Sequence, residues 1–162
     1  MKIAVFLPNW VGDVVMATPT LRALREHLGT SGRLLGVMRP QAAGVLAGTN
    51  WLDEQLVYDP RSADFGERGW TLVRRLRREC VDLAILLPNS WRTALLALAS
   101  GAKDRLGYER GGRGLLLTRK LYPPRKDGHL QPVSALDYYL ELAYAAGCQS
   151  ASRQVQLATL PA

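Results

Sequence analysis

A single aspartate follows the first apolar run of the chain, at a position suited to acid–base chemistry. The run at residues 2–7 reads KIAVFL, and residues 10–13 then bring a Trp, a Gly and an Asp together. In that loop Gly12 allows a tight backbone turn, and Asp13 falls at the start of the next helix. A carboxylate there can accept a proton from a substrate hydroxyl, or it can cap the helix. Spacing alone favours the cap.

Two further segments contain groups that could bind a substrate. Residues 88–92 include Asn89 and Ser90, either of which can cap the helix that follows. Residues 103–126 hold eight cations with four interleaved glycines. The eight are Lys103, Arg105, Arg110, Arg113, Arg119, Lys120, Arg125 and Lys126. Guanidinium groups on such a backbone suit bidentate capture of phosphates or carboxylates, and a mobile, solvated loop explains the composition equally well.

Several other motifs of known chemistry are missing from the sequence. Residues 9–13 contain one glycine, where the dinucleotide-binding pattern G-x-G-x-x-G requires three. No Walker loop and no G-x-S-x-G elbow occurs. Cys80 and Cys148 belong to no ligand-type cluster, so neither a zinc site nor a disulfide framework is expected. We therefore predict no metal and no cofactor.

The charge of the chain indicates an anionic partner. Its 162 residues, about one domain in size, carry 21 Lys and Arg against 14 Asp and Glu, a formal net charge of +7. Such an excess fits a nucleic acid, an acidic membrane surface or a phosphorylated substrate. A solvated basic surface would give the same balance. No apolar run approaches the roughly 18 residues that a membrane-spanning helix needs.

The elements that must position these groups alternate between short apolar runs and helical patterns. Strands are expected at 2–7, 33–38, 54–58, 82–87 and 104–108, and helices at 14–28, 41–47, 70–80, 91–100 and 133–146. Pro19 either kinks the first helix or lies at the first position of a second segment capped by Thr18. The alternation predicts an α/β fold: an open, mostly parallel, Rossmann-like sheet with helices on both faces. Ligands of such sheets bind where strands end, and residues 8–13, 88–92 and 108–125 each follow one of the predicted strands.

Three motifs resemble one known family. They are KIAVFLPNWVGDVVMATPT at 2–20, DLAILLPNS at 82–90 and RLGYERGGRGLLL at 105–117. In order and spacing they are similar to the lipopolysaccharide heptosyltransferases of glycosyltransferase family 9, and within these to the heptosyltransferase II group. The resemblance implies the two-domain GT-B fold. Residues 1–150 would then be the acceptor-side Rossmann-like domain and residues 151–162 the start of the interdomain linker, with the C-terminal donor domain absent.

The resemblance also implies a reaction. Enzymes of this family transfer heptose from ADP-heptose to the inner core of lipopolysaccharide, with inversion at the anomeric carbon. The Asp of the Gly-Asp pair in the first loop is their proposed general base. That position is Asp13 in this chain, so the resemblance overrides the preference for a cap. ADP-heptose would bind mainly to the absent domain, and we therefore expect the chain alone to be inactive.

The acceptor that the family implies is an anionic, phosphorylated lipid, which gives the basic segment a role without any nucleic acid. The residues expected to bind this acceptor are Asn9, Trp10, Gly12, Asn89, Ser90, Arg110 and Arg113. Arg61 and Arg68 are equally open candidates. The family also implies a cytoplasmic location, with peripheral contact at the inner face of the cytoplasmic membrane.

Two alternatives stay open from the sequence. The chain could belong to a family 9 enzyme that acts on a different glycan acceptor. It could also be a stand-alone α/β module that binds a nucleotide or nucleic acid. The second alternative has weak support, because the four Trp residues are scattered at positions 10, 51, 70 and 91 instead of interleaving with the cations.

Overall fold

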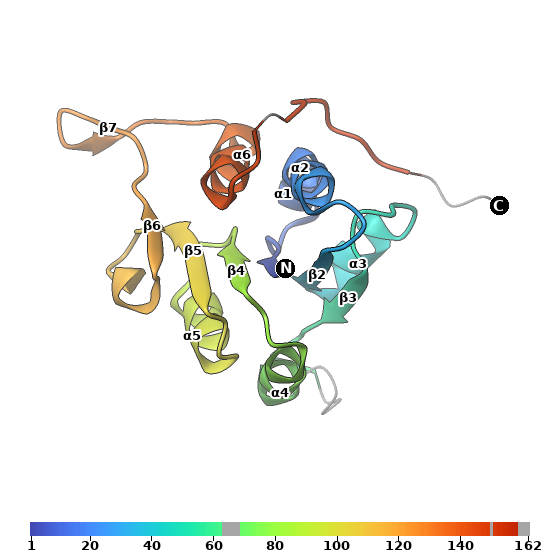
Figure 1. Cartoon of the computed structure of the whole chain (residues 1–162). Coiled ribbons are helices and arrows are strands. Elements are labelled where there is room, and N and C mark those ends of the chain that lie inside the picture. The colour runs from blue at the N-terminus through green and yellow to red at the C-terminus, as the bar shows by residue number, and fades with distance from the viewer. Residues whose placement is uncertain (63–68, 150, 159–162) are drawn as a thin grey trace.

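Five apolar runs of the sequence form parallel strands of one sheet in the computed structural model, which describes residues 1–62, 69–149 and 151–158 (Figure 1). They are β1 (Lys2–Phe6), β2 (Arg33–Met38), β3 (Glu54–Val57), β4 (Leu83–Leu86) and β5 (Asp104–Tyr108). A further strand, β6 (Arg119–Leu121), completes the order β3-β2-β1-β4-β5-β6. All five pairings in this sheet are parallel. The predicted open parallel sheet is therefore confirmed.

Helices cover both faces of the sheet, which is why its central strands are apolar on both sides. On one face lie α1 (Val11–Met16), α2 (Thr18–Leu28), α3 (Pro40–Leu46) and α6 (Ala135–Ala146). On the other lie α4 (Gly69–Glu79) and α5 (Trp91–Ala99). All four residues of β4 are buried between these layers. Within the described residues, no helix is both long and apolar enough to cross a bilayer.

The strand order changes direction once, beside β1. The chain passes from β1 to β2 and β3 with its connecting helices on one face, and α4 then returns it to β4 on the other side of β1 (Figure 1). Right-handed crossovers require the helices to change face when the direction changes. The loops after β1 and β4 therefore diverge, and the carboxyl edge of the sheet gains a crevice between them.

The first long helix of the sequence is split in two. α1 ends at Met16 and α2 begins at Thr18, with Pro19 in the first turn of α2, where its missing N–H has no helical partner to lose. The split confirms the second of the two predicted alternatives, but the residue at the cap position is Ala17. The Thr18 hydroxyl instead donates to the carbonyl oxygen of Val15 at 2.8 Å.

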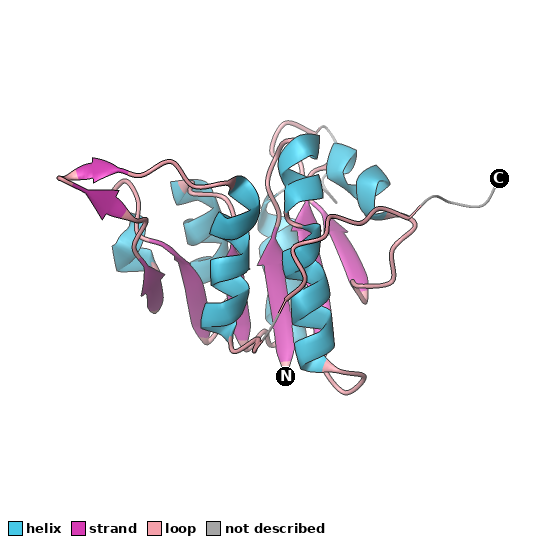
Figure 2. Cartoon of the chain, turned by 90° about the horizontal axis from the view of Figure 1, so that it is seen from above, coloured by secondary structure: helices cyan, strands magenta, loops and turns pink. Residues whose placement is uncertain are grey.

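The stretch rich in glycine and arginine contains more regular structure than the sequence analysis expected. After β5 come a short 3-10 helix, η2 (Arg113–Leu116), then β6, and then an antiparallel hairpin of β7 (Arg125–Lys126) and β8 (His129–Leu130). Asp127 and Gly128 form the turn of this hairpin with φ angles of 52° and 81°. This left-handed geometry is the one that two-residue hairpins favour. The hairpin projects from the body of the protein (Figure 2).

Residues 151–158 contain no helix or strand and run back along α2. Arg22 on that helix donates from Nη2 to the carbonyl oxygens of Ser152 at 3.0 Å and Gln154 at 3.2 Å. These residues are the described part of the segment that the sequence analysis assigned to a linker. In this structure the segment is attached to the α2 side of the domain.

Candidate functional site

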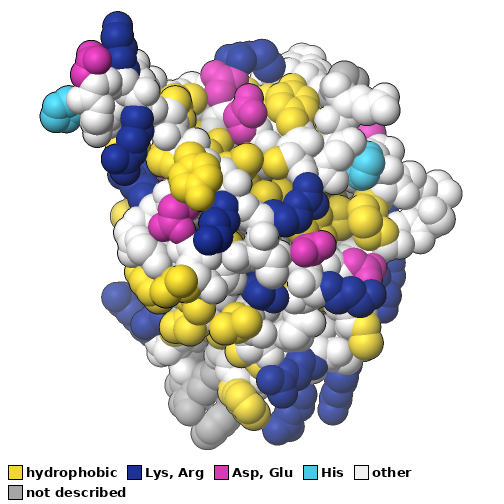
Figure 3. Space-filling model, turned by 60° about the vertical axis from the view of Figure 1, so that its left-hand side comes forward, with side chains coloured by type: hydrophobic (Ala, Val, Ile, Leu, Met, Phe, Trp, Pro, Cys, Tyr) yellow, Lys and Arg dark blue, Asp and Glu magenta, His cyan; other side chains and the backbone are white. Residues whose placement is uncertain are grey.

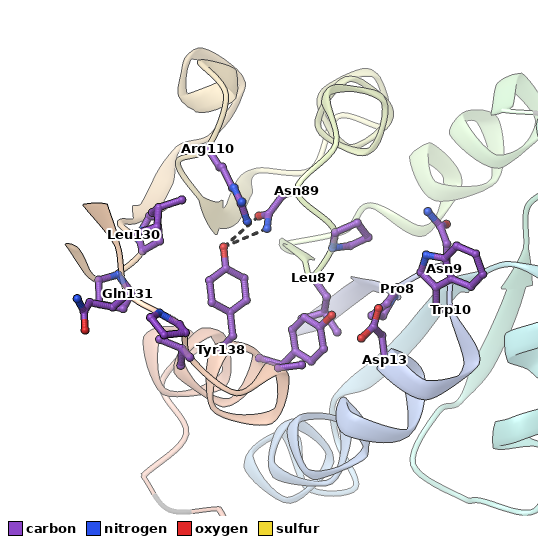
Figure 4. A pocket seen from close by; sticks show the side chains of 17 residues that line it. Pro8, Asn9, Trp10, Asp13, Leu87, Asn89, Arg110, Leu130, Gln131 and Tyr138 are labelled. Atoms are coloured by element: carbon purple, nitrogen blue, oxygen red, sulfur yellow. Dashed lines mark hydrogen bonds between the residues drawn. The ribbon is translucent and has the colours of Figure 1, made fainter. Parts of the chain in front are cut away.

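A cavity of about 580 Å³ opens at the carboxyl edge of the sheet, at the crevice beside β1 (Figure 4). Its walls come from the loops after β1, β4 and β5, together with the hairpin region and the first half of α6. These loops meet because the carboxyl ends of parallel strands lie at the same edge. The expected convergence of the three chemistry-bearing segments is therefore confirmed.

Asp13 lies in the wall of this cavity, at the third position of α1. Trp10 occupies the N-cap position and makes no side-chain capping bond, so the interpretation of Asp13 as the cap was wrong. The Asp13 carboxylate is half-buried. Within the described residues it accepts no hydrogen bond and pairs with no cation. Its oxygens are thus left for a molecule that enters the cavity.

The other first-loop residues differ in what they contribute. Trp10 also lines the cavity, with 77% of its surface exposed, and Asn9 stands beside it (Figure 4). The Asn9 side chain accepts a bond of 3.3 Å from Arg39 Nε. Gly12 lies inside α1, and a Cβ added there would meet nothing within 4 Å. The expectation that Gly12 supplies a tight turn is therefore wrong, since its φ is not positive.

The loop after β4 divides its two predicted binding residues between different roles. Ser90 is the N-cap of α5 and accepts a bond from Thr93 N at 3.2 Å, which confirms it as one of the two proposed caps. Asn89 instead lines the cavity, where its Nδ2 lies 3.0 Å from the hydroxyl of Tyr138 (Figure 4). Of this pair, only Asn89 belongs to the cavity wall.

Two arginines of the basic segment, three residues apart, have opposite surroundings. Arg110 is exposed and lines the cavity. Arg113 is 0% exposed, and burial lowers the pKa of its guanidinium. Its donors bind the carbonyl oxygens of Tyr108, Pro88 and Ser90 and the side-chain oxygen of Asn89. This corrects the expectation that Arg113 reaches a ligand: its hydrogen bonds hold the loops around the cavity.

The remaining cations of the segment are likewise split between structural and exposed positions. Arg105 donates to the carbonyl oxygens of Leu116 and Ala102, both at 2.8 Å, and Lys103 forms an ion pair with Asp82. The exposed ones are Lys103, despite its ion pair, and Arg119, Lys120, Arg125 and Lys126. Figure 3 shows basic side chains spread over one face of the molecule and over the arm that projects from it. Of the two open alternatives, Arg61 borders a neighbouring hollow, and Arg68 lies outside the described residues.

Two tyrosines of α6 were missed by the sequence analysis. Tyr138 and Tyr139 both line the cavity, and burial raises the pKa of each hydroxyl, with the charge of Asp13 adding to the effect at Tyr139. The ring of Tyr138 stacks on Tyr108 with centroids 3.7 Å apart. Adjacent tyrosines early in a predicted helix gave no signal of their own, because their place depends on how α6 docks. No group of three or more His, Cys, Asp or Glu that could hold a metal occurs in residues 1–62, 69–149 or 151–158.

Comparison with known proteins supplies a family. Residues 69–157 match the family model of glycosyltransferase family 9 (heptosyltransferase). Lipopolysaccharide heptosyltransferase 2 of Salmonella typhimurium is 28% identical over 159 residues, which cover 96% of this chain and 43% of that protein. The structure of Escherichia coli ADP-heptose lipopolysaccharide heptosyltransferase II superposes with a TM-score of 0.72 at 25% identity, over 100% of this chain and 47% of that one.

A third similarity supports the fold alone. The E. coli heptosyltransferase WaaC, solved with ADP, gives a TM-score of 0.72 at 15% identity, over 96% of this chain and 50% of that one. The chain thus spans about half the length of the relatives that it matches. The Rossmann-like architecture predicted for one half of a GT-B enzyme agrees with these superpositions. Because the family model covers more than half of its residues, this chain belongs to glycosyltransferase family 9, the heptosyltransferase family.

Proposed function

We propose that this chain is the acceptor-binding half of an inverting glycosyltransferase that moves heptose from ADP-heptose to the inner core of lipopolysaccharide. Asp13 is the general base. The observation that carries the proposal is the carboxylate of Asp13, which faces a large cavity at the strand ends without a hydrogen bond or ion pair in the described part of the chain. A carboxylate with no structural partner is free to take a proton.

The proposed reaction is a single displacement. An acceptor hydroxyl attacks the anomeric carbon of the heptose while Asp13 takes the hydroxyl proton. The new carbon–oxygen bond forms as the bond from the anomeric carbon to the diphosphate breaks, and ADP leaves with the electron pair. Attack opposite the leaving group inverts the anomeric configuration.

The surroundings of Asp13 suit an anionic sugar acceptor. Arg110 can pair with a phosphate or carboxylate on the acceptor, and the exposed indole of Trp10 offers a flat apolar face to a sugar ring. Asn9 and Asn89 add amide groups to the same cavity. The exposed cations of the basic segment would attract a phosphorylated lipid to this side of the protein.

The donor side is assigned to a second domain. Relatives of this family are about twice as long as this chain, and the E. coli WaaC structure contains ADP. We assign the binding of ADP-heptose mainly to the half of such proteins that this chain does not cover. We also propose a cytoplasmic location for this protein, with peripheral contact at the inner face of the cytoplasmic membrane, where a lipid acceptor would be reached.

A chimera tests the proposal. This chain is joined to the second half of E. coli heptosyltransferase II and given ADP-heptose with lipopolysaccharide truncated in its inner core. We expect the chimera to transfer heptose with inverted anomeric configuration, measured by NMR of the product. Neither the 162-residue chain nor the E. coli half alone should do so.

The outcomes separate the candidate functions. Transfer to another glycan, and none to the truncated lipopolysaccharide, would show a family 9 enzyme with a different acceptor. Retention of the anomeric configuration would contradict Asp13 as a base in a single displacement. Turnover by the 162-residue chain alone would contradict the assignment of the donor site to a second domain.

A further inference from the structure

The cavity wall contains a chain of hydrogen bonds that begins at a buried cation. The guanidinium of Arg113 is 0% exposed and forms no ion pair in the part of the chain that the structure describes. Its Nη2 donates to Oδ1 of Asn89 at 3.1 Å. Because a guanidinium has only donors, the group of Asn89 that faces it must be the oxygen. This contact fixes which way the Asn89 amide points.

The fixed amide determines what Tyr138 can do. With Oδ1 turned to Arg113, Nδ2 of Asn89 lies 3.0 Å from the Tyr138 hydroxyl and donates to it. The hydroxyl oxygen is therefore occupied as an acceptor, and its proton must find another partner. In this structure the hydroxyl donates to Oδ1 of the same amide at 3.3 Å, a long bond to an oxygen that also accepts the 3.1 Å bond from Arg113. The hydroxyl proton can therefore rotate to a better acceptor when one enters the cavity.

The Tyr138 ring is also held rigidly, so the position of its hydroxyl is defined. Its ring stacks on that of Tyr108 at an interplanar angle of 13°, and the Tyr108 hydroxyl donates to the Tyr138 carbonyl oxygen at 3.0 Å. Figure 4 shows the Tyr138 hydroxyl pointing to the side of the cavity where Arg110 and Asn89 lie, with Asp13 on another wall. Burial raises the pKa of Tyr138, so its hydroxyl stays protonated at neutral pH.

We infer that Tyr138 is a substrate-binding residue whose hydroxyl donates a hydrogen bond to an oxygen atom of the bound acceptor, and that Asn89 and Arg113 are positioning residues that set the direction of this donation. The inference rests on the proposed function, since it assigns one contact of the acceptor. Under this inference, the buried Arg113 affects binding although it does not contact the ligand.

The binding test uses the 162-residue chain and the deacylated inner-core oligosaccharide, followed by calorimetry. Tyr138→Phe removes only the hydroxyl, and we expect affinity to fall about threefold to tenfold, as for one hydrogen bond. Asn89→Asp keeps an acceptor for Arg113 and even adds an ion pair, but it removes the Nδ2 donor. The Tyr138 hydroxyl would then donate to the new carboxylate instead of the ligand.

Three results follow if the inference is right. Asn89→Asp should lose at least as much affinity as Tyr138→Phe, because the new carboxylate also repels the anionic acceptor, while its melting temperature does not fall. The double variant should bind no more weakly than Asn89→Asp alone, since in that variant the Tyr138 hydroxyl already no longer donates to the ligand. Tyr144→Phe, which changes an exposed tyrosine of the same helix, is the matched control and should bind like the parent. Parental affinity in Asn89→Asp, or additive losses in the double variant, would overturn the inference.

A measurement without ligand separates this inference from the proposed function. In a 15N-labelled chain, the side-chain amide signals of Asn89 should shift in Tyr138→Phe and in Arg113→Lys, and not in Tyr144→Phe. If Arg113→Lys leaves these signals unchanged, Arg113 does not orient the amide and the inference fails even when the oligosaccharide binds. If the amide signals respond as expected but the parent binds no oligosaccharide, the acceptor contact and the proposed function are both wrong, and only the orientation of the amide stands.

Discussion

Helices α1 and α6 each carry an aspartate at their third position, and the two carboxylates have opposite surroundings. In α6, Ser134 is the N-cap, and its hydroxyl accepts from Asp137 N at 3.2 Å and donates to Asp137 Oδ2 at 2.7 Å. Arg153 pairs with the same carboxylate. In α1 the cap position holds Trp10, and Asp13 has none of these partners within the described residues.

The difference separates a carboxylate that completes a helix from one that is available to a substrate. The hydrogen bond from Ser134, followed by the charge of Arg153, holds the pKa of Asp137 below its usual value. The carboxylate oxygens of Asp137 therefore accept hydrogen bonds within the local structure. Asp13 occupies the same helical position with the same favourable dipole, but faces a cavity. An uncapped helix start beside a cavity is thus a more specific sign of function than an aspartate at a helix start.

The largest expected effect comes from changing both carboxylates in the same way. In the chimera, Asp13→Asn should lower the rate of heptose transfer by about 10²–10⁴-fold, the usual contribution of a general base. The loss of a charge near the helix N-terminus should cost only about 0.3–1 kcal/mol of stability. Asp137→Asn is the control and should leave the rate unchanged. The rate of heptose transfer and the melting temperature, measured for each variant, test this expectation. Equal transfer rates in the two variants would contradict the distinction between Asp13 and Asp137.

Arg113 and Arg110 extend the same contrast to cations. Arg113→Ala should lower the free energy of unfolding by roughly 3 kcal/mol, because it leaves a cavity and several buried acceptors without a donor. Arg110→Ala should change it by less than about 0.5 kcal/mol, as is usual for an exposed side chain. Arg110→Ala should instead weaken the binding of the inner-core oligosaccharide, most strongly at low salt. Urea unfolding and calorimetry measure the two quantities, and similar stabilities for the two variants would contradict this account.

A third experiment converts one helix start into the other. Trp10→Ser gives α1 the Ser-x-x-Asp arrangement that α6 already has. The new hydroxyl should bond to Asp13, and we expect transfer to fall roughly tenfold below that of Trp10→Ala, as for a bond to an ionised group. Trp10→Ala is the matched control, since it loses the same indole without gaining a hydroxyl. If the two variants transfer heptose equally fast, capture of Asp13 by a cap does not limit the reaction.

The smallest effect concerns acid stability. Because the pKa of Asp137 is lowered by folding from its ordinary 3.8, the ionised form stabilises the folded protein. That contribution is present above pH 3.8 and is lost as the pH falls through the lower folded value. The difference in melting temperature between the parent and Asp137→Asn should thus stay constant near neutrality and shrink in acid. A difference that grows in acid would show that the pKa shift has the opposite sign.

Much of the fold could be predicted because single residues and local patterns determine it. The apolar run of β4 identified a buried parallel strand, and Gly147 ends α6 with a φ of 112°, as expected for a left-handed C-cap. Pro19 marked the break between two helices. The hairpin was missed although its Asp127-Gly128 turn is a recognised signal, because its two strands are only two residues long.

The site was less predictable because tertiary contacts decide it. Arg110 and Arg113 lie in the same run of glycines and cations, and only the path of η2 buries one and exposes the other. Tyr138 reaches the cavity because α6 packs back over the sheet beside β5 and α2. Asp13 could be named from a motif, but whether it has partners could be seen only once α1 was placed.

The burial of Arg113 has a consequence for how ionic strength acts on this protein. Counterions screen exposed charges within about 8 Å at physiological salt, whereas a buried charge is screened much less. The cation of Arg113 lies directly behind Asn89 in the cavity wall and forms no ion pair in the described part of the chain. Its electrostatic potential therefore persists inside the cavity when salt has neutralised the surface arginines. An anion bound in the cavity is still attracted at salt concentrations that abolish long-range electrostatic steering. High salt should therefore lower the association rate of an anionic ligand more than it raises the dissociation rate.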